Sequence, residues 1–175
     1  MILKKRGKHA QVWVETVVYT LIGLAILGVI LAIAMPKIKQ TENEVVIEQT
    51  LAAINSLNQK VHNIQMGSGN SRQIDFRIKE GELIIDSVND SISFVLEKTS
   101  LLYSELGVIV PQGDIKILTV ENGKKYNVHL ILDYSGQLNI TFENQEIVKE
   151  LSSATNPYKL LIKNQGRGNT DISLI

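Results

Sequence analysis

The chain contains no cysteine and only three histidines among its 175 residues. The absence of cysteine excludes disulfide bonds, Cys-ligated zinc, iron–sulfur clusters and a thiol nucleophile. The histidines stand far apart, at positions 9, 62 and 129, so a His-rich metal site is not expected either. We therefore expect no metal site and no cofactor, and we interpret His62 and His129 as packing residues.

The chain also lacks a net charge, because 18 Lys and Arg balance 18 Asp and Glu. A nucleic-acid-binding protein of this size would be expected to carry an excess of basic side chains. None of the short sequence patterns of P-loop, hydrolase-elbow, zinc-protease or EF-hand sites occurs. We therefore expect no enzymatic activity and no nucleic-acid partner.

The balanced total conceals an uneven distribution of charge. Residues 1–10 carry four basic side chains and no acid, so their charge is +4. All 18 acids and the other 14 basic residues follow, which gives 11–175 a charge of −4. Between His9 and Pro36, Glu15 is the single formally charged residue.

A long apolar run follows this basic segment: Thr16–Met35 is 20 residues without a charge. At about 1.5 Å of rise per residue, such a helix spans the roughly 30 Å hydrocarbon core of a bilayer. Because the basic residues precede the run, the positive-inside rule predicts a single-pass membrane protein. Its N-terminus would lie in the cytoplasm and its C-terminal domain outside.

Two ordinary explanations of this run are a cleaved secretory signal and a simple membrane anchor. A secretory signal has an apolar region of about 7–15 residues and a small-residue cleavage site. This run is longer and ends in AIAMP at 32–36. A simple anchor fits the length but gives no reason for Glu15, since a carboxylate within a membrane helix is costly. Glu15 is therefore a candidate functional residue, and the alternative is that it reaches the cytoplasmic interface.

The basic KRGKHA at 5–10, QVWVE at 11–15 and the apolar run together resemble the class III signal peptide of type IV pilins. In that family a prepilin peptidase cuts on the cytoplasmic side of the apolar segment, and the mature chain carries Glu at its fifth position. A cut between Ala10 and Gln11 places Glu15 there, whereas a cut after Gly7 would place it eighth. Gln rather than Phe at the first mature position resembles archaeal pilins.

The resemblance implies how such a protein would assemble. Cleavage frees the α-amino group of Gln11, which can approach Glu15 of a neighbouring subunit when the helices bundle. Two charges that are costly alone in an apolar medium then neutralise each other and fix the register. We expect Gly23 and Gly28 to permit close approach of these helices. The implied partners are other pilin subunits, prepilin peptidase, an assembly ATPase, a membrane platform protein and, before assembly, membrane lipid.

Beyond Pro36 the pattern becomes amphipathic. Apolar residues recur at steps of three and four, which predicts a helix with one buried face; they are Ile47, Leu51, Ile54, Leu57, Val61 and Ile64. We expect Pro36 to bend or locally open the helix, because its nitrogen cannot donate to the helical ladder. The breaker-rich GSGNS at 67–71 ends this helical extension.

Residues 67–175 have the alternating pattern and turn signals of a β-rich domain. Hairpins are expected around three glycine-containing turns, at 80–81, 122–123 and 165–168. A turn at 135–136 would continue the second hairpin into a meander. We favour a strand at 92–98, although 92–106 would also suit a helix, and we expect a short helix at 143–151. About eight strands predict an antiparallel, sandwich-like domain.

The sequence therefore predicts an α+β fold, with a long N-terminal helix packed on a C-terminal antiparallel β-sandwich-like domain. Its four parts would be a basic leader at 1–10, a transmembrane helix at 11–36, an amphipathic extension at 37–66 and an extracellular β-rich domain at 67–175. Asn89 and Asn139 each begin an N-x-S/T triplet and are candidate N-glycosylation sites on the outer side.

Our leading hypothesis is a structural subunit, major or minor, of an extracellular type IV pilus-like filament. Two alternatives remain open at the level of sequence. One is a membrane-anchored β domain that binds surfaces as an adhesin does and never polymerises. The other is a pseudopilin of a secretion or DNA-uptake system.

Overall fold

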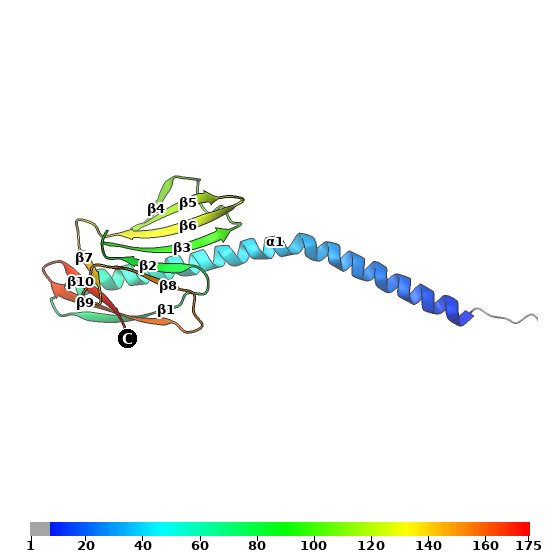
Figure 1. The fold of residues 1–175 in the computed structure, drawn as a ribbon, viewed down its shortest axis with the longest axis horizontal. Coiled ribbons are helices and arrows are strands. Elements are labelled where there is room, and N and C mark those ends of the chain that lie inside the picture. Colours follow the sequence, from blue (N-terminus) through cyan, green and yellow to red (C-terminus); the bar gives the residue numbers. More distant parts are fainter. Residues whose placement is uncertain (1–7) are drawn as a thin grey trace, which may run out of the picture. The chain divides into compact units, whose positions relative to one another are not determined.

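The structure is a computed structural model that describes residues 8–175, with side chains from Trp13 onward. Among these residues, one long helix, α1 (Lys8–Ile64), precedes ten strands (Figure 1). The chain divides into two compact units, residues 1–39 and 40–175, and α1 begins in the first and ends in the second. Residues 1–7 of the expected leader lie outside the described part.

The ten strands form two sheets, and together with α1 they confirm the predicted α+β fold. Sheet A has the order β1–β9–β10–β7. Its strands are β1 (Ser71–Phe76), β9 (Tyr158–Gly166), β10 (Asn169–Leu174) and β7 (Asn139–Phe142). The pair β10–β7 is parallel, and the other pairs of sheet A are antiparallel.

Sheet B is antiparallel throughout and has the order β4–β5–β6–β3–β2–β8. Its strands are β4 (Ile109–Gln112), β5 (Ile115–Asn122), β6 (Lys125–Asp133), β3 (Ser91–Thr99), β2 (Glu82–Asp86) and β8 (Val148–Ser152). The hairpin at 122–123 is confirmed as β5–β6, and the hairpin at 165–168 is confirmed as β9–β10.

The C-terminal part of α1 supplies one wall of the hydrophobic core. The six apolar residues of the predicted stripe, Ile47 to Ile64, are each 5% exposed or less. They belong to a single cluster with the inward-facing residues of both sheets. Burial of a large aliphatic side chain contributes about 1.5–3 kcal/mol, so this stripe fixes the helix on its own β domain. The amphipathic prediction is thereby confirmed.

Buried polar side chains fix the position of α1 against sheet B. The Asn58 amide donates to Oδ2 of Asp114 at 2.7 Å and accepts from the hydroxyl of Tyr134 at 2.9 Å. Burial, followed by the nearby Asp114 carboxylate, raises the pKa of the Tyr134 hydroxyl, which therefore stays protonated as a donor. Nearer the start of this unit, Asn43 donates to Oγ1 of Thr99 at 2.6 Å.

Sheet A holds the C-terminal end of the same helix. The buried Asn164 of β9 donates from Nδ2 to the carbonyl oxygens of Ile64 and Gly67, at 3.0 and 3.1 Å. Ile64 is the last residue of the helix, and its carbonyl has no donor within the helix, so Asn164 acts as a C-terminal cap supplied by a distant strand. Gln65 adds a bond from Nε2 to Oγ1 of Thr170 at 2.8 Å.

The prediction of a hairpin at 80–81 is wrong. β1 pairs with β9 in sheet A, whereas β2 pairs with β3 and β8 in sheet B. Gly81 has a positive φ of 83°, and a Cβ at this position would lie 2.5 Å from the Val95 carbonyl oxygen. The glycine is therefore required by close contact with β3 and not by a two-strand turn.

Two further expectations in this domain are wrong. The meander through 135–136 does not form, because the chain leaves sheet B after β6 and β7 joins sheet A in parallel with β10. Residues 143–151 do not form a helix: Glu143 and Asn144 adopt positive φ in a tight turn, and β8 follows. The strand favoured at 92–98 is confirmed as β3. Two strands that the sequence did not predict, β4 and β8, are also present.

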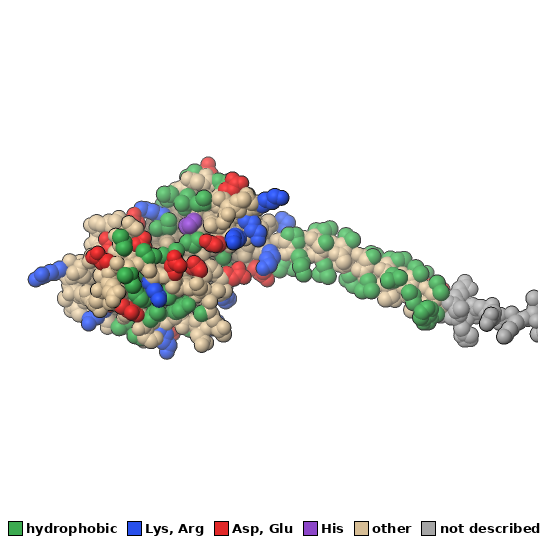
Figure 2. Space-filling model, in the orientation of Figure 1, with side chains coloured by type: hydrophobic (Ala, Val, Ile, Leu, Met, Phe, Trp, Pro, Cys, Tyr) green, Lys and Arg blue, Asp and Glu red, His purple; other side chains and the backbone are tan. Residues whose placement is uncertain are grey.

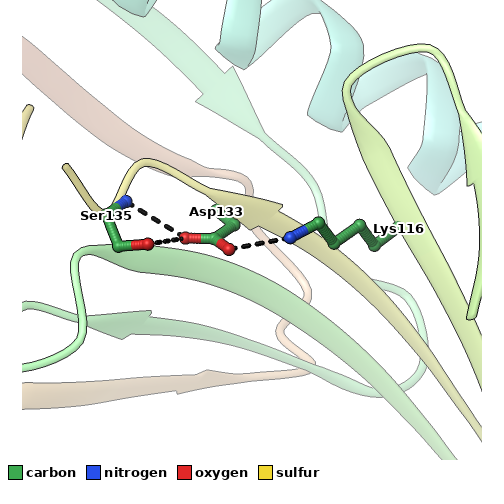
Figure 3. A network of polar contacts seen from close by, with 3 residues as sticks. All are labelled: Lys116, Asp133 and Ser135. Atoms are coloured by element: carbon green, nitrogen blue, oxygen red, sulfur yellow. Dashed lines mark hydrogen bonds and ion pairs between the residues drawn. The ribbon is translucent and has the colours of Figure 1, made fainter. Parts of the chain in front are cut away.

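A polar network ties β5 to the end of β6 (Figure 3). Lys116 Nζ lies 2.8 Å from Oδ2 of Asp133. The backbone N–H and the hydroxyl of Ser135 donate to Oδ1 of the same carboxylate, at 3.0 and 2.5 Å. The bond from Lys116, followed by those from Ser135, lowers the pKa of Asp133 from 3.8 to about 2.

This depressed pKa predicts an acid-sensitive contribution to stability. The Asp133 contacts should stabilise the fold fully above pH 3.8 and lose their effect as the pH falls toward 2, because the unfolded chain binds the proton first. The pair is partly exposed, so the effect should be below about 1 kcal/mol. Denaturant unfolding measures the free energy of unfolding across this pH range. As the pH falls, this free energy should decrease less in Asp133→Asn than in the native protein. The exposed Glu121→Gln should keep the native slope, and equal slopes for all three proteins would contradict the prediction.

Candidate functional site

The N-terminal part of α1 presents apolar side chains on all its faces. Every large apolar side chain from Trp13 to Ile38 is between 39% and 72% exposed. Its most apolar stretch has a mean hydropathy of 2.7 and is not buried at all. Among the described residues, α1 is the one helix long and apolar enough to cross a membrane. On the face that Figure 2 shows, hydrophobic side chains lie along this segment with backbone and uncharged residues between them.

Glu15 is the one charged side chain between Trp13 and Met35, and it has a partner on its own helix. The hydroxyl of Tyr19 donates to Oε1 of Glu15 at 3.3 Å. Residues four apart lie on the same face of a helix, so this contact needs no tertiary structure. The sequence reasoning overlooked Tyr19, although the spacing of four from Glu15 would have identified it.

Gly23 and Gly28 both lie in open surroundings. A Cβ built on either residue would meet nothing within 4 Å. Because each residue advances about 100° around the helix, the two glycines face directions about 140° apart. They therefore do not lie on one common face of the helix.

The structure describes the surroundings of Pro36 but not the side chains of Ala10 and Gln11. The helix is continuous through Pro36, so the chain does not open into a non-helical segment there. Ala10 and Gln11 lie within the first turns of α1, and their side chains are outside the described part.

The two candidate glycosylation sites differ in their surroundings. Asn89 is exposed in the turn between β2 and β3, and its Nδ2 donates to Oδ2 of Asp86 at 2.7 Å. Asn139 is half-buried at the start of β7, and its Nδ2 donates to Oδ1 of Asn169 at 3.1 Å. Asn89 is thus the more accessible acceptor in the folded domain.

The histidines of the β domain have different environments. His129 is half-buried in β6, and burial lowers its pKa, while Glu97 acts in the opposite direction. Its neutral form is therefore favoured by the fold. His62 is more exposed than expected, and its ring packs edge-on against Tyr134 at a centroid distance of 6.4 Å. Within residues 8–175, no group of three or more His, Asp or Glu is arranged to hold a metal ion.

The protein therefore combines a candidate membrane-spanning helix with a folded β domain. Comparisons with protein-family models, curated proteins and solved structures find no match.

Proposed function

We propose that this protein is a structural subunit of an extracellular type IV pilus-like filament. The observation that carries the proposal is Glu15, the one charged side chain in the exposed, largely apolar segment from Trp13 to Met35. A simple anchor gains nothing from a carboxylate at that position, whereas a filament subunit gains a charge that a neighbour can pair. The resemblance of residues 4–36 to a class III signal peptide supports the same function.

In this proposal the apolar segment has two successive environments. Membrane lipid covers it before assembly, and the helices of neighbouring subunits cover it afterwards. The Tyr19 hydroxyl gives the Glu15 carboxylate a hydrogen bond in the first environment. In the second, the α-amino group of Gln11 from an adjacent subunit supplies an opposite charge. The pair resists mismatched registers, because a displaced subunit leaves two charges unpaired in an apolar medium.

The remaining parts of the proposal follow from this arrangement. The N-terminus of the precursor lies in the cytoplasm, where prepilin peptidase removes residues 1–10. An assembly ATPase and a membrane platform protein then extrude the subunit, and the β domain lies outside the cell. That domain keeps its own covered core, since the stripe from Ile47 to Ile64 is buried within residues 40–175. It therefore has no need of the apolar segment in order to fold.

The direct test is the mass of the mature N-terminus. We expect the chain to begin at Gln11 when it is produced together with an archaeal prepilin peptidase. It should retain residues 1–10 when the peptidase is absent or catalytically inactive. A chain that begins at the initiator methionine in both cases, or beyond Met35, would reject the filament proposal.

A further inference from the structure

A polar groove lies on the β domain, far along the chain from the apolar segment. Its larger part has a volume of about 450 Å³ and is lined by Arg77, Lys79, Ser153, Ala154 and Thr155. A smaller part of about 210 Å³ shares the two basic residues and is closed by side chains of α1. We call the larger part the Arg77 groove.

Backbone structure holds the two walls of the Arg77 groove together. In the segment that includes and follows β1, Phe76 and Ile78 are buried, so Arg77 and Lys79 both point outward. The N–H of Ala154 donates to the carbonyl oxygen of Ile78 at 3.1 Å. This bond places residues 153–155 beside residues 77–79. The groove is therefore a product of the fold, since its two walls come from segments about 75 residues apart in the chain.

The two basic side chains give the Arg77 groove a positive charge. None of its lining residues is acidic. Among the described residues, Arg77 has no ion pair with a carboxylate, and Lys79 donates from Nζ to the neutral Oε1 of Gln49 at 3.3 Å. The smaller part is less positive, because Asp75 lines it. The larger part thus combines two cations with the hydroxyl groups of Ser153 and Thr155.

We propose that the Arg77 groove binds an oxyanion, namely a carboxylate, sulfate or phosphate group carried by a small molecule or an acidic polymer. Guanidinium, ammonium and hydroxyl groups all donate hydrogen bonds, and charge-assisted bonds to oxyanions are the strongest of this kind. Nucleic acid is disfavoured, because no aromatic side chain lines the groove to stack on a base. This proposal does not rest on the filament function, since all its residues lie in the unit 40–175.

The test is a titration of the full-length, isotope-labelled protein in detergent micelles, followed by NMR. Sodium sulfate, sodium phosphate and sodium glucuronate should each shift the amide signals of 77–79 and 153–155 in a saturable manner. The Arg77→Gln/Lys79→Gln double variant should bind about tenfold more weakly, the effect of losing two partly exposed charge contacts. The matched control, Arg72→Gln/Lys163→Gln, removes one Arg and one Lys from exposed positions in sheet A, outside the groove, and should bind as the native protein does.

Three outcomes would overturn the proposal: sodium chloride of equal ionic strength produces the same shifts, the two double variants weaken binding equally, or no shift saturates. A Ser153→Ala/Thr155→Val variant keeps both charges and should also weaken binding. It tests the contribution of the two hydroxyl groups independently of the basic side chains. Polygalacturonate distinguishes the two sources of the anion. Tighter binding of the polymer than of glucuronate, lost in Arg77→Gln/Lys79→Gln, would assign an acidic polymer, whereas equal binding per carboxylate would assign a small anion.

Discussion

Replacing Glu15 with alanine is expected to abolish most filament assembly while leaving synthesis, membrane insertion and leader removal intact. The variant removes a carboxylate from an apolar helix, so insertion becomes easier. In the filament, however, the amine of Gln11 loses its partner. Removal of one member of a buried pair costs about 3–5 kcal/mol, and about 1.4 kcal/mol corresponds to a tenfold change in an equilibrium. Filaments sheared from cells and counted by electron microscopy should therefore fall by more than about tenfold.

Two control variants separate the charge of Glu15 from other effects. Glu42→Gln removes an exposed carboxylate outside the apolar run and should leave filament yield unchanged. Tyr19→Phe removes the hydroxyl that donates to Glu15 while keeping the ring, and should reduce yield less than Glu15→Ala does. Normal filaments from Glu15→Ala would show that the carboxylate does not set the register. Absence of filaments from the native chain, despite a mature N-terminus at Gln11, would favour a non-polymerising subunit.

Truncation of Ile54 is expected to destabilise the β domain strongly, whereas truncation of Ile26 on the same helix should not. Ile54 is fully buried in the core of residues 40–175, and Ile26 is 55% exposed. Ile54→Ala should lower the free energy of unfolding by about 2–5 kcal/mol, since it leaves a cavity among the residues around it. Ile26→Ala should change this free energy by less than about 0.5 kcal/mol.

Guanidinium unfolding in detergent, followed by the near-ultraviolet circular dichroism of the tyrosines, measures this difference. Buried Tyr134 reports on the core, whereas the single tryptophan, Trp13, lies in the apolar segment. Because both variants replace isoleucine with alanine in one helix, their helix propensities change equally. Equal destabilisation by the two variants would contradict the division of α1 into a core segment and an uncovered segment.

The helix was the most predictable part of the fold. The step from an apolar run to a stripe at intervals of three and four is a local property of the sequence, and the structure buries the predicted stripe residues. The hairpins show where such local signals fail. Asn122-Gly123 and Glu80-Gly81 look alike as turns, yet the first joins adjacent strands and the second joins strands of different sheets.

The candidate sites also differ in how far the sequence alone could predict them. Glu15 and Tyr19 are four residues apart, so the sequence alone could identify their contact. Arg77 and Ser153 are brought together by a backbone bond between segments about 75 residues apart, which no local pattern encodes. Asn164 likewise caps a helix that ends 100 residues earlier in the chain.

The sequence by itself determined the long helix, its two regimes of hydrophobicity, the isolated Glu15 and the β character of the remainder. These depend on composition and on spacings of two to four residues, which act within one element. The tertiary structure alone decided which strands share a sheet, the parallel β7–β10 pair, the cap from Asn164 and the Arg77 groove. Strand partners far apart in the chain are selected by how the two sheets and the helix jointly bury their apolar faces, and that choice is a property of the whole domain.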